Sequence, residues 1–140
     1  MGIVVANLSA SVRWYADNLG WVCKHEEYIA VAGAKVAYLL PSSADINCGA
    51  TLLQLVEPIG PSAVLDYLSL HGEGVHHVCF EVGDISEAVE RLGEDHEQIF
   101  GGGRNQLACF LEKSPNGVLI ELTERLIPSK TQTPPNAPAS

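Results

Sequence analysis

The order of apolar and polar positions alternates between a period of two and a period near 3.6, the side-chain periods of strands and helices. In the first half, this pattern predicts a strand near 2–6, a helix near 9–18 and strands near 21–30, 35–40 and 51–57. In the second half, it predicts a strand near 76–82, a helix near 84–93 and strands near 96–99, 107–112 and 117–123. One strand, one helix and three strands therefore occur twice in the same order.

Two stretches of sequence also repeat, as expected for a duplicated module. The segment VANLSASV at 5–12 resembles VGDISEAV at 82–89, with an offset of 77 residues, and both have a serine near the predicted helix start. The segment GATLLQLVE at 49–57 resembles NGVLIELTE at 116–124, with an offset of 67 residues. The change from 77 to 67 places about ten additional residues in the first copy, and the loop 41–50 is the place we expect them.

The repeat defines the expected domain organisation. We expect one domain over 1–125, with module one at 1–59, a linker at 60–74 and module two at 75–125. The run AVLDYL at 63–68 predicts a short helix inside the linker. The remaining residues, 126–140, contain several prolines among polar residues and are predicted to form a flexible tail.

Composition narrows the class of protein. The chain has 140 residues, 46% of them hydrophobic and 18% charged, which is typical of a globular domain. Its formal charge of −9 argues against a nucleic-acid partner. The sequence has neither the long apolar run of a membrane span nor the pattern of a signal peptide, so we expect a cytoplasmic protein that does not bind membranes. The four cysteines show no short metal-ligand spacing and are interpreted as inert thiols.

Two polar residues occupy equivalent positions on apolar strands. Gln54 lies within LLQLV and Glu121 within LIELT, and the offset of 67 relates them. A buried amide or carboxylate without a partner costs several kcal/mol, so two at matched positions suggest a shared partner such as a metal ion. The alternative is an edge strand whose alternate residues face solvent.

A pair of histidines begins the first strand of module two. His76 and His77 are adjacent, so they should point to opposite faces of the strand, and only one can enter the same site as Glu121. We select His77, and we expect His76 to face a loop or solvent. A structural role for a single strand histidine is the alternative interpretation.

These segments resemble a known family. The pieces GEGVHHVCFEV and GVLIELTE resemble methylmalonyl-CoA epimerases, which are members of the vicinal oxygen chelate (glyoxalase/bleomycin resistance) superfamily, and NLSASVRWYADNLGW is a pattern common to that superfamily. The resemblance implies an α+β fold in which two tandem βαβββ modules form a cup-shaped, open barrel (glyoxalase-like). It also implies that His77, Gln54 and Glu121 bind a divalent metal, which is Co, Mn, Ni, Zn or Fe in different relatives, and that Glu121 is catalytic.

The sequence departs from the family at two positions. The fourth ligand is the repeat partner of His77, and the offset places it one residue before Met1. Either the natural start lies upstream, or three protein ligands and water suffice, or the metal has been lost. Some epimerases also have a glutamate on the strand that here reads GAKVAYL at 33–39, where no carboxylate is present. Lys35 and Tyr38 are the candidates to replace it.

Three residues are candidates for binding substrate: Arg104, Lys35 and Tyr38. Arg104 follows three glycines at 101–103, which predict a flexible lid or wide turn rather than a phosphate-binding loop. From that position Arg104 could bind a substrate carboxylate or a CoA phosphate. An exposed, solvated arginine is the alternative.

The resemblance implies a metal-dependent epimerase that acts on a methylmalonyl-CoA-like 2-acyl thioester through an enolate. A glyoxalase-type lyase or another metal-dependent enzyme of the superfamily is the first alternative, because one fold supports many chemistries. A metal-free protein that binds a small molecule such as an antibiotic is the second. In each case we expect a small-molecule partner, and we expect a homodimer because an open, cup-shaped sheet needs further cover.

Overall fold

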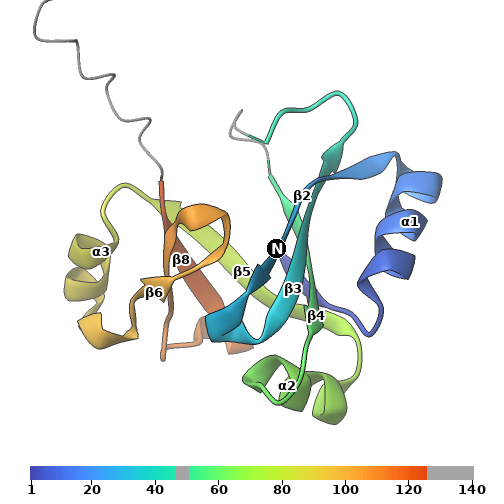
Figure 1. Ribbon diagram of the computed structural model, residues 1–140. Coiled ribbons are helices and arrows are strands. Elements are labelled where there is room, and N and C mark those ends of the chain that lie inside the picture. The colour runs from blue at the N-terminus through green and yellow to red at the C-terminus, as the bar shows by residue number, and fades with distance from the viewer. Residues whose placement is uncertain (47–50, 126–140) are drawn as a thin grey trace, which may run out of the picture.

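The computed structural model describes residues 1–46 and 51–125, which form one mixed sheet with helices packed against it (Figure 1). The strands lie in the order β2-β3-β4-β1-β5-β8-β7-β6. The strands are β1 (Gly2–Val4), β2 (Trp21–Ile29), β3 (Ala34–Pro41), β4 (Leu53–Pro58), β5 (Gly74–Val82), β6 (Phe100–Gly101), β7 (Leu107–Phe110) and β8 (Ile120–Glu124). The α-helices in this part of the chain are α1 (Leu8–Leu19), α2 (Ala63–His71) and α3 (Ile85–Leu92).

The two halves of the sheet have the same internal pairing. The first strand of each half pairs in parallel with the last, β1 with β4 and β5 with β8. An antiparallel pairing of β1 with β5 joins the halves, and the sheet curls into a half-barrel. The α+β fold implied by the family resemblance, with two similar modules in one curled sheet, is confirmed.

The residues that cap helices α1 and α3 are also equivalent in the two modules. The side chain of Asn7 accepts a hydrogen bond from the N–H of Ala10 at 2.9 Å, and Asp84 does the same for Glu87 at 2.9 Å. The capping residues are therefore Asn7 and Asp84, which precede the two serines singled out from the sequence and are related by the same offset of 77. Helices α1 and α3 each end at a glycine in the left-handed conformation.

Most of the hydrophobic core lies between the helices α1 and α3 and the outer face of the sheet, on the two flanks seen in Figure 1. Under α1 it comprises Val5, Leu8, Ala37, Leu39 and Leu55. Under α3 it comprises Ile85, Ala88, Val89, Cys109, Leu111 and Leu122. Because side chains alternate along a strand, the residues between these positions point to the inner face of the curled sheet. A third buried cluster, which includes Val36, Tyr38 and Val56 and packs against Val64 of α2, lies on the inner face, and the rest of that face is available for polar groups.

The boundaries differ from the prediction in module two. Residues 96–99 were predicted as a strand, but His96–Gln98 form a 3₁₀ turn, and β6 is only Phe100–Gly101. Asp95 explains the turn, since its carboxylate accepts the N–H of Glu97 at 2.9 Å and so favours a helical start. Pro115–Gly117 also form a 3₁₀ turn, so β8 begins later than the predicted residue 117.

The linker helix is present as α2. The predicted tail, 126–140, and part of the predicted loop, at 47–50, lie outside the described residues. Within the described ranges, no helix combines the length and apolar character needed to cross a membrane.

Substitution of Leu55 tests whether the hydrophobic core under α1 is correctly assigned. Its side chain is fully buried under α1, so Leu55→Ala should lower the free energy of unfolding by about 2–5 kcal/mol. Leu70→Ala is the control, since Leu70 is 78% exposed and its truncation should have little effect. Urea unfolding measures both, and equal effects of the two variants would contradict the assigned core.

Candidate active site

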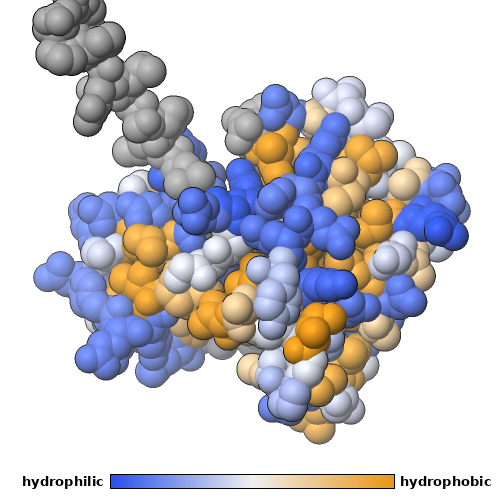
Figure 2. All heavy atoms as spheres, viewed as in Figure 1, coloured by the Kyte–Doolittle hydropathy of each residue, from blue (hydrophilic) through white to orange (hydrophobic). Residues whose placement is uncertain are grey.

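Three polar side chains from the central part of the sheet meet on its inner face. Gln54 is on β4, His77 on β5 and Glu121 on β8. The Nε2 atom of His77 lies 3.0 Å from Oε1 of Gln54 and 3.8 Å from Oε2 of Glu121. The structure therefore brings together the three residues that the sequence singled out as ligands, and Figure 2 shows hydrophilic residues gathered where the two halves meet.

Strand β1 makes this meeting possible because it lies between β4 and β5. Gly2 is opposite Gln54 on one side and opposite His77 on the other. A Cβ atom at Gly2 would overlap the imidazole of His77, at 2.5 Å from Nε2. The imidazole thus occupies the space that a side chain on β1 would fill.

His76 was expected at a loop or solvent, and this expectation is wrong. Its Nδ1 atom is 2.9 Å from Nδ1 of His77, and its ring packs edge-on against Tyr67 of α2 at 4.8 Å between centroids. The register of β1 against β5 shifts at Gly2, next to this pair. One of the two Nδ1 atoms must carry the proton that they share, so His76 influences the tautomer of His77.

Burial controls the charge of these groups. Burial lowers the pKa of His77 to about 3, so the imidazole is neutral at physiological pH. Burial raises the pKa of Glu121. Cys79, opposite Glu121 in the ladder, has its pKa raised to about 12 by burial and by the Glu121 charge. The Cys79 thiol therefore keeps its proton and is not a nucleophile, as the sequence suggested.

The donor set fits a divalent cation. It offers a neutral imidazole nitrogen, an amide oxygen and a carboxylate, all on one wall of the half-barrel and all largely buried. Among the described residues, no three His, Cys, Asp or Glu side chains cluster at metal-binding spacing, and the third donor here is an amide. A cation bound here would lower the raised pKa of the buried Glu121 carboxylate, because its positive charge favours the ionised form.

A second polar group faces this one from β2 and β3. Glu27 accepts hydrogen bonds at Oε1 from the Tyr38 hydroxyl, at 3.1 Å, and from the backbone N–H of Arg104, at 2.6 Å. Sequence reasoning did not identify Glu27, which lies on the first hairpin among other charged residues. The β2–β3 pairing could have identified it. Glu27 is opposite Val36, and Val36 is two residues before Tyr38 on β3, so the side chains of Glu27 and Tyr38 lie on the same face of the sheet.

The triple-glycine segment is an ordered strap, which we define as residues 101–105. Arg104 and Asn105 have φ of 56° and 59°, and a Cβ atom at Gly103 would overlap the Tyr38 hydroxyl. Glycine at 103 therefore allows the strap to lie directly on Tyr38. Of the two forms predicted from the sequence, a flexible lid or a wide turn, the structure shows a turn, and Glu27 accepts the Arg104 N–H within it.

Comparison with known proteins now assigns the family. The family model of the glyoxalase/bleomycin resistance protein/dioxygenase superfamily matches residues 1–110. The chain belongs to this superfamily.

Several relatives of the chain are methylmalonyl-CoA epimerases. The mitochondrial methylmalonyl-CoA epimerase of Mus musculus is 34% identical over 134 residues, covering 89% of this chain and 70% of that protein. The crystal structure of methylmalonyl-CoA epimerase from Mycobacterium tuberculosis matches with a TM-score of 0.77 and 29% identity, covering 90% of this chain and 85% of that one. A variant of the Streptomyces coelicolor methylmalonyl-CoA epimerase in complex with 2-nitronate-propionyl-CoA matches with a TM-score of 0.77 and 31% identity, covering 89% of this chain and 91% of that one.

The three candidate substrate-binding residues lie at different places in the structure. Tyr38 is buried on the inner face, whereas Lys35, three positions earlier, is on the other face of β3 and exposed, so the structure does not bring it to the site. Arg104 lies with its guanidinium 5.9 Å from the centroid of the Tyr38 ring. It also lines a surface pocket of about 710 Å³ between β2 and the strap.

That pocket and the three converging residues are distinct places. The pocket is not lined by Gln54, His77 or Glu121, and Glu27 connects the two because it lines the pocket and also holds Tyr38. The converging residues are the centre of the candidate site, because buried groups with shifted pKa values indicate a catalytic site better than an open surface pocket does.

Substitution of Gly2 tests whether the His77 imidazole lies against β1. Gly2→Ala should displace the imidazole and lower the free energy of unfolding by about 1–3 kcal/mol, because the new methyl group overlaps it. Gly74→Ala is a matched control on β5, where a Cβ atom would meet nothing within 4 Å. Urea unfolding compares the two, and a Gly2→Ala protein as stable as the control would show that the imidazole lies elsewhere.

Proposed function

We propose that this protein is a metal-dependent epimerase of a methylmalonyl-CoA-like 2-acyl thioester. The observation that carries the proposal is the convergence of His77, Gln54 and Glu121 on one wall of the half-barrel. The epimerases among its relatives, including one in complex with a propionyl-CoA analogue, support the substrate class.

His77, Gln54 and Glu121 are the residues that would hold the divalent metal. When bound, such an ion acts as a Lewis acid that polarises substrate carbonyl oxygens and makes the proton between them more acidic. His77 contributes its Nε2 atom, which requires the proton on Nδ1, and the Nδ1 atom of His76 at 2.9 Å is the acceptor for that proton. Gln54 contributes an uncharged oxygen and so leaves more of the positive charge for the substrate.

Glu121 would also act as one proton-transfer group. Its carboxylate is largely buried on the inner face, beside the place where the metal would hold the substrate and away from bulk water, so it can take a proton directly from the substrate. The C2 proton of a 2-methylmalonyl thioester lies between two carbonyl functions, so its removal leaves an enolate. Return of a proton on the other face of C2 inverts the configuration.

Arg104 and the pocket beside it suit the anionic parts of the substrate. Lys24 and Arg104 both line the pocket. In a protein with a net charge of −9, two cations at one pocket make it a favourable place for a carboxylate or phosphate. We propose that the CoA portion enters from this side.

Solvent exchange at C2 tests the proposed chemistry. In deuterium oxide with added cobalt or manganese, the protein should incorporate deuterium at C2 of methylmalonyl-CoA, and a chelator should stop the incorporation. Glu121→Gln should reduce the rate by about 10²-fold or more because it removes the proton-transfer group. Mass spectrometry of the thioester measures the exchange.

A matched variant separates the role of Glu121 from an effect on β8. Glu124 is on the same strand with its side chain on the other face, so Glu124→Gln should exchange at the wild-type rate. Wild-type protein that incorporates no deuterium with any of these metals would contradict the epimerase proposal and favour a lyase or binding role.

A further inference from the structure

Inversion at C2 needs a second proton-transfer group, because one proton leaves from one face of the carbon and another arrives on the opposite face. Glu121 provides the first group in the proposed function, and this inference rests on that proposal. The second group must face Glu121 across the half-barrel and must be able both to give and to take a proton.

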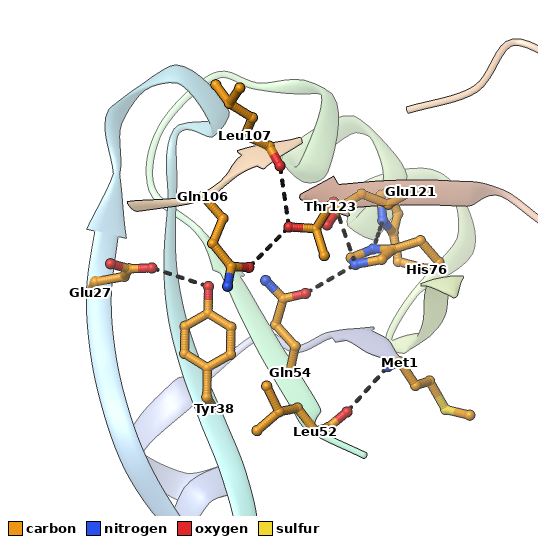
Figure 3. A network of polar contacts seen from close by, with 11 residues as sticks. Met1, Glu27, Tyr38, Leu52, Gln54, His76, Gln106, Leu107, Glu121 and Thr123 are labelled. Carbon is orange, nitrogen blue, oxygen red and sulfur yellow. Dashed lines mark hydrogen bonds and ion pairs between the residues drawn. The ribbon is translucent and has the colours of Figure 1, made fainter. Parts of the chain in front are cut away.

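We propose that the Tyr38 hydroxyl, backed by the Glu27 carboxylate, is this second group. Tyr38 is opposite Gln54 in the β3–β4 ladder, so both side chains lie on the inner face. Its hydroxyl donates to Oε1 of Glu27 at 3.1 Å. In Figure 3, Glu27 and Glu121 lie at opposite ends of a row of polar side chains, with Tyr38 and Gln54 between them.

The surroundings of Tyr38 hold its hydroxyl in one position. The side chain is 6% exposed, the strap covers it at Gly103, and the His25 ring stacks on it at 5.8 Å between centroids. Gln54, the neighbour of Tyr38 in the ladder, contacts His77 at 3.0 Å, and His77 lies 3.8 Å from Glu121, so one row of polar side chains joins Tyr38 to Glu121. Burial, together with the charge of Glu27, raises the pKa of Tyr38, so it holds its proton at neutral pH.

Glu27 is suited to accept the proton of the Tyr38 hydroxyl and to pass it to water, because its hydrogen bonds with the Arg104 N–H, His25 and Tyr38 outweigh its partial burial and lower its pKa. Besides Tyr38 and the Arg104 N–H, it has His25 at 3.1 Å from Oε2. Its side chain is 24% exposed and lines the pocket. A proton on Glu27 can therefore pass inward to Tyr38 or outward to solvent.

The proton transfers balance in both directions. For one epimer, the Tyr38 oxygen takes the proton from C2 while its own hydroxyl proton passes to ionised Glu27, and the electron pair stays on the enolate. Protonated Glu121 then breaks its O–H bond to form the new C–H bond on the other face of C2. The enzyme is left with Glu27 protonated and Glu121 ionised, which is the form that acts on the other epimer by the reverse sequence.

Other ionisable side chains near the half-barrel fit this role less well. Glu81 is paired with Arg125 at 3.3 Å at the far end of β5, and Lys35 is on the opposite face of β3. Among the described residues, Tyr38 with Glu27 is the pair that combines burial, a position across from Glu121 and a path to solvent.

The test uses each pure epimer of the substrate in deuterium oxide with the cobalt-loaded protein. In Tyr38→Phe and in Glu27→Gln, epimerisation should fall by about 10²-fold or more, because one face of C2 loses its proton-transfer group. Both variants should still incorporate deuterium into one epimer with retained configuration, since Glu121 can remove and return a proton on its own face. Glu27→Gln keeps an oxygen for the Arg104 N–H, so the strap stays anchored.

Controls separate chemistry from folding. Glu26→Gln changes an exposed neighbour on β2 and should epimerise at the wild-type rate. Thermal unfolding of the variants should show folded proteins, as expected for substitutions this small. If either variant epimerises at nearly the wild-type rate, or if exchange is lost equally for both epimers, the assignment of Tyr38 and Glu27 is wrong. If wild-type protein exchanges neither epimer, the proposed function fails and this assignment fails with it.

Discussion

The contact between His77 and Gln54 is the interaction on which the rest of the site depends. It joins module two to module one at 3.0 Å, across β1, and requires that β1 present no side chain at Gly2. A buried polar pair of this kind is stable only when each partner is satisfied. Helices α1 and α3 make this possible, since they cover the outer face with apolar contacts and leave much of the inner face for polar groups.

The duplication explains why polar groups occur in this arrangement. Each module places its first and last strands side by side, so the inner residues of β1 and β4, and of β5 and β8, become neighbours. Gln54 and Glu121 are equivalent positions on the last strands, and the pairing of β1 with β5 brings the two sets together. A fold built from two equal modules thus forms one site at their junction.

The sequence predicted the fold well because its signals are local and repeated. Period and offset placed the helices, and matched polar residues in apolar strands identified Gln54 and Glu121. Short turns were harder, because the Asp95 cap outweighs the strand pattern at 96–99. The position of His76 was missed because a register shift next to Gly2 changes which neighbours it meets.

Glu27 shows what a single sequence cannot reveal. It is one of many acidic residues in the chain, and what distinguishes it is the approach of the strap, 77 residues away, whose Arg104 N–H reaches it at 2.6 Å. Such a contact depends on the curvature that brings β2 to the strap, and no local pattern encodes it. The left-handed conformations at 104 and 105 belong to the same contact, since they turn the N–H toward the carboxylate.

The proposed function requires a metal centre at the junction of the two modules. Anomalous X-ray diffraction from cobalt-soaked crystals tests this requirement most directly. One cobalt peak is expected at about 2.0–2.3 Å from Nε2 of His77 and from oxygens of Gln54 and Glu121. A cobalt ion bound elsewhere, or no peak at these three residues while His77 and Gln54 remain in contact, would contradict it.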